Sequence, residues 1–147
     1  MMKKTSKIRA QRGAVMIEMA LVSLFVLIPL LFGIIEFSLI LYNQAMITNA
    51  SREGARAGIV YDEPRLTEAG ITTVVNNYCQ DHLITFGSAT PVTDAVPDAC
   101  PDIVSSGDSI TVTVDYQYDW LILPNLPYAT ALVGPVNLSA ITVMRCE

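Results

Sequence analysis

An apolar run at residues 14–42 is the feature that most constrains the fold of this chain. Only two charged residues, Glu18 and Glu36, interrupt it. As an α-helix the run would be about 43 Å long, which exceeds the roughly 30 Å hydrocarbon thickness of a bilayer. It therefore predicts a membrane-spanning helix, and Pro29 and Gly33 favour a kink near its middle.

A cleaved secretory signal is the competing interpretation of this run. Such signals have apolar regions of about 7–15 residues, followed by a cleavage site of small residues. The present run is roughly twice that length, and residues 32–44 contain no convincing site of that kind. A helix that remains in the protein is therefore favoured.

Positive charge is concentrated before the apolar run. Residues 1–13 form a basic leader that holds five of the nine Lys and Arg residues. Residues 14–147 carry four arginines against all 14 acidic residues, a net charge of −10. Because basic flanks stay on the cytoplasmic side of a membrane, we expect a single-pass protein with a cytoplasmic N-terminus and an exterior C-terminal domain. An acidic exterior without a basic patch disfavours nucleic-acid binding.

The helix is expected to continue outside the membrane through residues 43–60, which contain no proline. Ala50, Gly54 and Gly58 recur there at four-residue spacing. Small residues at this spacing allow another backbone to approach closely, which indicates a helix-packing face. The alternative is a juxtamembrane helix in which these small residues are incidental.

Residues 61–147 have the pattern of a small α+β domain. Glu63 and Pro64 suit a helix start, and an apolar face then continues to Cys79. The proline-containing stretch 87–108 is interpreted as a loop. Residues 109–120 alternate between apolar and polar side chains and predict a half-buried strand, while 136–146 predict a final strand. An antiparallel pair is the simplest arrangement, with a shorter strand near 83–86 as a candidate third member.

Catalytic and metal-binding chemistry has little support in the sequence. His82 is the only imidazole, and it lacks a nearby nucleophile motif. The aspartates of residues 94–108 do not follow a calcium-loop pattern. No cysteine pair has zinc-ligand spacing, and no glycine-rich phosphate loop is present. We therefore expect neither an enzyme nor a bound metal or cofactor.

Three cysteines, Cys79, Cys100 and Cys146, fall in the exterior part, where a disulfide can form. An odd number is simplest to explain as one pair and one remaining thiol. Cys79–Cys100 is the favoured pair because both residues flank one irregular segment. Pairings that include Cys146 stay open.

The junction between leader and apolar run carries the most specific motif. A basic leader ends in Gly13, Ala14 follows, and Glu18 would be the fifth residue after cleavage between them. This constellation resembles the processing site of type IV prepilins. Together with SREGARAG at residues 51–58 and MRCE at 144–147, it is similar to the TadE-like (TadE/TadF) minor pilins, or pseudopilins, of the tight-adherence Flp pilus system.

The resemblance implies a pilin-like fold and a role in pilus assembly and surface adhesion. Its implied partners are the prepilin peptidase, other pilins and pseudopilins, and the Tad inner-membrane platform. The protein would reside in the inner membrane or enter the pilus, with its domain in the periplasm or outside. The different-class alternative is a signal-anchored exterior binding protein of the cell envelope that is not processed at Gly13.

Glu18 acquires a physical purpose in the pilin interpretation. Cleavage creates an α-amino cation on Ala14, and Glu18 of one subunit can pair with the amine of its neighbour. Glu36 lies 18 residues further on, which in an ideal helix is five whole turns and the same face. Glu36 is thus expected either to face a partner or to lie in the outer headgroup layer.

Overall fold

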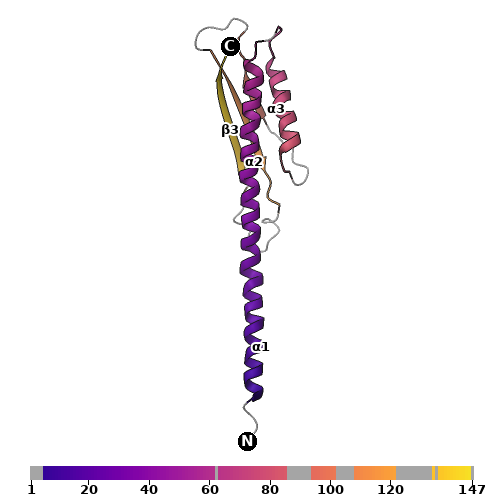
Figure 1. The fold of residues 1–147 in the computed structure, drawn as a ribbon, viewed down its shortest axis with the longest axis vertical. Coiled ribbons are helices and arrows are strands. Elements are labelled where there is room, and N and C mark those ends of the chain that lie inside the picture. Colours follow the sequence, from indigo (N-terminus) through magenta and orange to yellow (C-terminus); the bar gives the residue numbers. More distant parts are fainter. Residues whose placement is uncertain are drawn as a thin grey trace.

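The structure is a computed structural model that describes residues 5–61, 63–85, 94–101, 108–121, 134 and 136–146. It consists of a long N-terminal helix with a small α+β domain packed along its C-terminal part (Figure 1). This is the fold class expected from the sequence.

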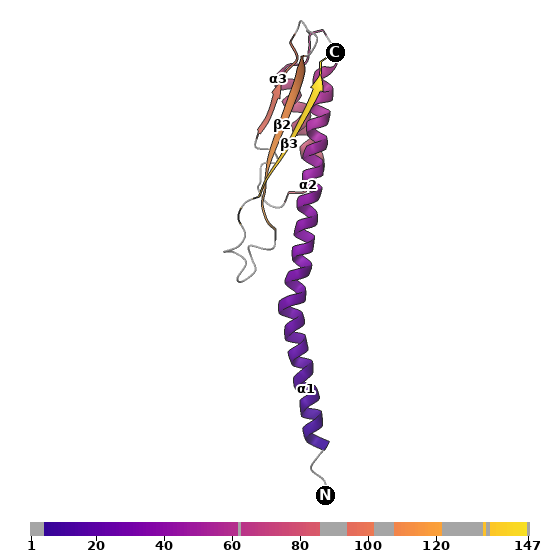
Figure 2. The same cartoon turned by 90° about the vertical axis from the view of Figure 1, so that its left-hand side faces the viewer.

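The long helix has three parts, α1 (Thr5–Val22), a π-helical turn η1 (Ser23–Leu27) and α2 (Ile28–Ile59). They follow one another as one continuous helix (Figure 2). Pro29 lies in the first turn of α2, where it has no N–H to donate and its ring conflicts with the carbonyl four residues earlier. A π-turn at this point is a local departure from α-helical bonding that accommodates the proline. The irregularity expected near Pro29 is therefore this turn.

The exterior domain adds α3 (Glu68–His82) and the strands β1 (Asp94–Asp98), β2 (Ser109–Tyr118) and β3 (Val136–Arg145). The strands form one antiparallel sheet in the order β1-β2-β3. The alternation of β2 is clear, and its inward side chains Ile110, Val112, Val114, Tyr116 and Tyr118 are all buried. They pack against α2 and α3, which lie beside each other on one face of the sheet (Figures 1 and 2).

Two elements differ from the sequence expectation. The third strand is β1, within the segment interpreted as a loop, whereas residues 83–85 form no strand and Phe86 lies outside the described residues. Pro97 is compatible with β1 because β1 is an edge strand. Helix α3 begins after Thr67 rather than at Pro64, since the Thr67 hydroxyl accepts a hydrogen bond of 3.3 Å from the Gly70 N–H and caps the helix.

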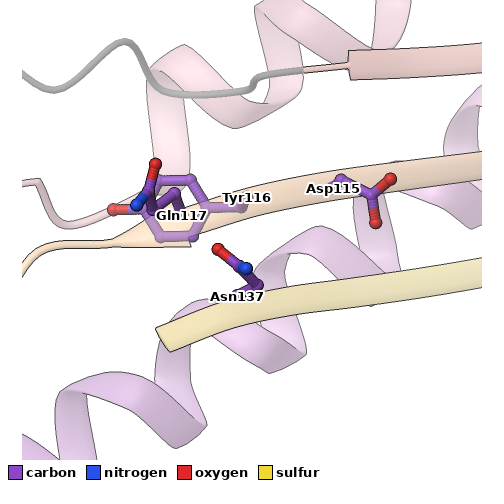
Figure 3. A pocket seen from close by; sticks show the side chains of 4 residues that line it. All are labelled: Asp115, Tyr116, Gln117 and Asn137. Atoms are coloured by element: carbon purple, nitrogen blue, oxygen red, sulfur yellow. The ribbon is translucent and has the colours of Figure 1, made fainter. Parts of the chain in front are cut away.

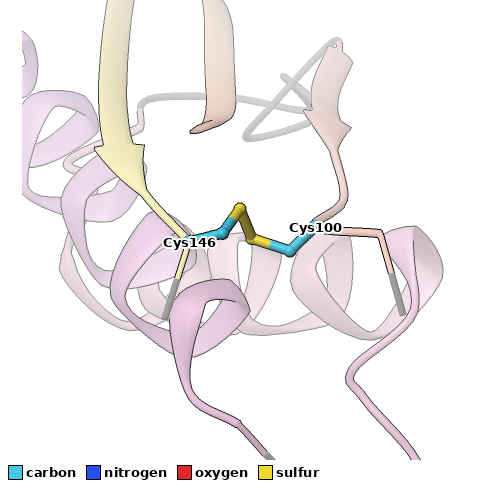
Figure 4. Close-up of a disulfide and its surroundings, with 2 residues drawn as sticks. All are labelled: Cys100 and Cys146. Atoms are coloured by element: carbon cyan, nitrogen blue, oxygen red, sulfur yellow. A yellow bond between two sulfur atoms is a disulfide. The ribbon is translucent and has the colours of Figure 1, made fainter. Parts of the chain in front are cut away.

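The disulfide joins Cys100 to Cys146, so the predicted Cys79–Cys100 pair is wrong (Figure 4). The register explains the correction: Asp98 lies opposite Thr111 and Ser109 lies opposite Arg145, which brings the two cysteines to the same end of the sheet. The Cα atoms are 5.9 Å apart. At a sequence separation of 46 residues, loop-closure entropy alone assigns the bond about 4 kcal/mol of stabilisation.

Cys79 is a buried free thiol on α3, and burial raises its pKa to about 11. At pH 8 we expect it to resist alkylation in the folded protein and to react fully after unfolding. Peptide mapping without reductant should recover Cys100 linked to Cys146 and alkylated Cys79 in a separate peptide. A linked peptide that contains Cys79 would refute this pairing.

Candidate functional site

The N-terminal half of the long helix extends away from the domain (Figure 1), and residues 13–28 are all exposed. Its large apolar side chains are exposed, with Met16 at 76% and Phe25 at 67%. Water does not solvate such a surface favourably, so it needs lipid or other helices around it. The helix is long and apolar enough to cross a membrane and fits a single-pass anchor.

Gly13, Ala14 and Glu18 lie within α1 at the start of this exposed segment. A Cβ added at Gly13 would meet no atom within 4 Å. Glu18 lies one helical turn after Ala14, so the two share a face. Its carboxylate is exposed, and within the described residues it has no hydrogen-bond or ion-pair partner. The junction is therefore open to an external enzyme or a neighbouring subunit.

Glu36 does not face a partner or the headgroups, the two interpretations that the sequence left open. Its side chain is fully buried, and the Tyr118 hydroxyl donates a 2.7 Å hydrogen bond to its Oε2. The π-turn adds one residue between the two glutamates, which rotates Glu36 roughly a quarter-turn away from Glu18. The Glu36 carboxylate thus binds the long helix to the exterior domain of the same chain.

Burial raises the pKa of Tyr118 well above its ordinary value, and the hydrogen bond to Glu36 raises it further. The phenol therefore remains a donor at any physiological pH. Its raised pKa stabilises the fold below about pH 10, and this stabilisation is lost at higher pH as the unfolded phenol ionises.

Tyr118→Phe should lower the free energy of unfolding by about 1–3 kcal/mol because a buried carboxylate oxygen loses its donor. Tyr116→Phe is the matched control, since Tyr116 is also buried on β2 and no hydrogen bond of its hydroxyl is seen among the described residues. Chemical denaturation of both variants checks the difference. Equal losses would show that the Tyr118–Glu36 bond does not stabilise the domain.

The small residues Ala50, Gly54 and Gly58 are buried within the chain itself. A Cβ on Gly54 would lie 2.5 Å from Val75 Cγ2, and one on Gly58 would collide with Ile110 and Ile71. The close approach expected from their spacing occurs, but the neighbours are α3 and β2 of the same chain. The opposite side of this helix exposes Arg52, Glu53 and Arg56.

Polar side chains of α2 also bind the domain. Asn43 is fully buried and exchanges two hydrogen bonds with the Ile84 backbone, at 3.0 and 3.1 Å. Gln44 donates to the Ser139 carbonyl at 2.9 Å, and the Ser51 and Thr142 hydroxyls are 2.7 Å apart. Sequence reasoning missed these contacts; the available signal was that polar residues begin directly after the apolar run, at Asn43 and Gln44.

A depression of about 370 Å³ lies beside β2 and β3, lined by Asp115, Tyr116, Gln117 and Asn137 (Figure 3). These side chains contain one carboxylate and two amides but no nucleophile beside a base. His82 lies elsewhere, exposed in the last turn of α3 and stacked on Tyr78. Within the described ranges, no three His, Cys, Asp or Glu side chains gather where they could hold a metal ion.

Comparison with known families matches residues 13–56 to the family described as TadE-like protein. The match covers the exposed helix, the junction and most of the small-residue segment. No curated protein and no solved structure matches the chain. Over residues 13–56 this chain is thus similar to the TadE-like family, as its N-terminal motifs predict. The similarity supports a Tad pilus-associated protein, and among the described residues one apolar helix fits a membrane anchor.

Proposed function

We propose that this protein is a minor pilin, or pseudopilin, of a Tad-type pilus machinery that acts in pilus assembly and surface adhesion. The observation that carries the proposal is that the helix after Gly13 exposes large apolar side chains and, among them, the carboxylate of Glu18. Insertion would place residues 1–13 in the cytoplasm and the domain in the periplasm or outside. Assembly would then exchange lipid around the helix for other pilin helices.

Processing is the first step of this function. A prepilin peptidase would hydrolyse the amide between Gly13 and Ala14, which leaves a carboxylate on Gly13 and an ammonium group on Ala14. The bond lies in a helix, so the enzyme must unwind the chain locally. Glycine costs about 1 kcal/mol of helix stability relative to alanine, which lowers the work of that unwinding. The open surroundings of Gly13 leave room for a protease groove.

Assembly is the second step, and Glu18 is its specific element. A carboxylate in an apolar helix bundle is costly when it is unpaired, and so is an ammonium group. Pairing Glu18 with the new α-amine of a neighbouring subunit compensates both charges and sets one axial register. The pair thus selects a correctly processed neighbour in one position.

N-terminal sequencing after expression with and without a prepilin peptidase tests the proposal. With the peptidase, the mature chain should begin at Ala14; without it, residues 1–13 should remain. A Gly13→Leu variant serves as the control and should stay unprocessed, because the bulky side chain obstructs entry of the extended backbone. An intact leader in the wild type under both conditions would favour the signal-anchored binding protein instead.

A further inference from the structure

The exposed apolar band of the long helix overlaps, along the helix axis, with the end of the exterior domain that lies nearest to the N-terminus. Large exposed apolar side chains continue from Val15 to Leu41 and Tyr42. Beyond Tyr42 the exposed positions of α2 are Ala45, Arg52, Glu53 and Arg56. The band is about 39 Å long at 1.5 Å per residue, which spans the hydrocarbon core and part of the headgroup layers.

Strand β2 runs down the helix toward this band. Ile110 packs at Gly58, Val112 packs at Gly54, and the Tyr118 hydroxyl reaches Glu36. Strand β2 therefore descends from the top of α2 as the residue number rises (Figure 2). Two residues of strand advance the chain by about 6.6 Å, or roughly four helical residues. On this scale Trp120 lies near the level of Phe37, within the apolar band.

Trp120 has the properties of a residue at a membrane–water boundary. It is partly exposed, and its ring meets Tyr118 edge-on with the centroids 6.0 Å apart. The indole N–H donates to the Gly134 carbonyl at 2.7 Å, so its one polar group is satisfied by the protein. The neighbouring Asp119 is exposed, which limits the depth to the hydrated headgroup layer.

From this placement we infer that Trp120 and the half-buried Leu121 form a membrane-facing base of the exterior domain, which rests in the headgroup layer of the bilayer. Tryptophan prefers this layer because its ring combines apolar area with a polar edge. Glu36 lies buried beneath Tyr118 and is therefore shielded from lipid. The inference rests on the membrane-inserted helix of the proposed function, but it does not depend on cleavage at Gly13.

Trp120 is the only tryptophan of the chain, so its fluorescence reports on this base alone. The test uses the full-length protein reconstituted into phosphatidylcholine vesicles with bromine at carbons 6 and 7 or at carbons 11 and 12 of one acyl chain. Because the ring would lie near the headgroups, the shallower bromines should lower its emission about twofold, and the deeper ones less.

Two reporter variants in a Trp120→Phe background make the outcome decisive. Leu24→Trp lies in the middle of the helix and should be quenched most by the deeper bromines. Thr113→Trp lies on β2, well above the apolar band, and should not be quenched. Quenching at Leu24→Trp without quenching of Trp120 would overturn the membrane-facing base while leaving the anchor intact. Quenching at neither position would overturn both the base and the inserted helix.

Discussion

Glu18→Gln should leave cleavage after Gly13 intact and prevent entry of the subunit into pili or pilin complexes. The substitution keeps the size and the hydrogen-bonding capacity of the side chain but removes the charge that compensates the Ala14 amine. An uncompensated ammonium group in an apolar bundle costs several kcal/mol, so incorporation should fall at least about 100-fold. Quantitative immunoblotting of sheared pili and of the membrane fraction, with N-terminal sequencing, measures both steps.

Glu53→Gln is the matched control, because Glu53 is an exposed carboxylate on the same helix outside the apolar segment. It should be processed and incorporated as the wild type is. Incorporation of Glu18→Gln at the wild-type level would refute the register role of Glu18. It would leave the proposed cleavage after Gly13 unaffected.

Gly58→Leu should unfold or severely destabilise the exterior domain. The added side chain would enter space already filled by Ile110 and Ile71, and both lie in the buried core. Overpacking costs about 1–3 kcal/mol for a few added methylenes, and a leucine here should exceed that range. The gain in helix propensity, about 1 kcal/mol, does not offset it. Protease resistance and chemical denaturation of the detergent-solubilised chain measure the loss.

Gly33→Leu provides the comparison for this substitution. Gly33 lies in the same long helix, but a Cβ there would meet nothing within 4 Å. The variant should keep the domain intact and gain slightly in helix stability. Equal stability of Gly58→Leu and Gly33→Leu would mean that the small-residue face does not pack against the domain.

Sequence patterns were sufficient where the signal is local. The 14–42 run and the absence of proline in 43–60 predicted one long helix, and strict alternation identified β2. The same patterns did not say which surface the small residues meet. Spacing shows that Gly54 and Gly58 permit a close approach, but the neighbour depends on how α3 and β2 fold back onto the helix. The surfaces that they contact belong to α3 and β2 of the same chain.

The predictions for the cysteine pairing and for the position of Glu36 were wrong for the same reason. Cys100 and Cys146 meet only because two antiparallel pairings bring their segments to one end of the sheet. Similarly, Tyr118 reaches Glu36 across 82 residues of sequence. The π-turn before Pro29 changed the helical phase as well, so counting at 3.6 residues per turn placed Glu36 on the wrong face. Strand register and helical phase depend on the whole chain, so neither can be obtained from the sequence of one segment.

Zero-length carbodiimide cross-linking of assembled, processed protein tests the counter-ion role of Glu18 most directly. The reagent condenses a carboxylate with an amine in contact with it, and water is lost as the amide forms. Mass spectrometry should find the Glu18 peptide joined to the N-terminal amine of a neighbouring subunit. A Glu18 peptide that stays unlinked, or that links only to Ala14 of its own chain, would contradict pairing between subunits.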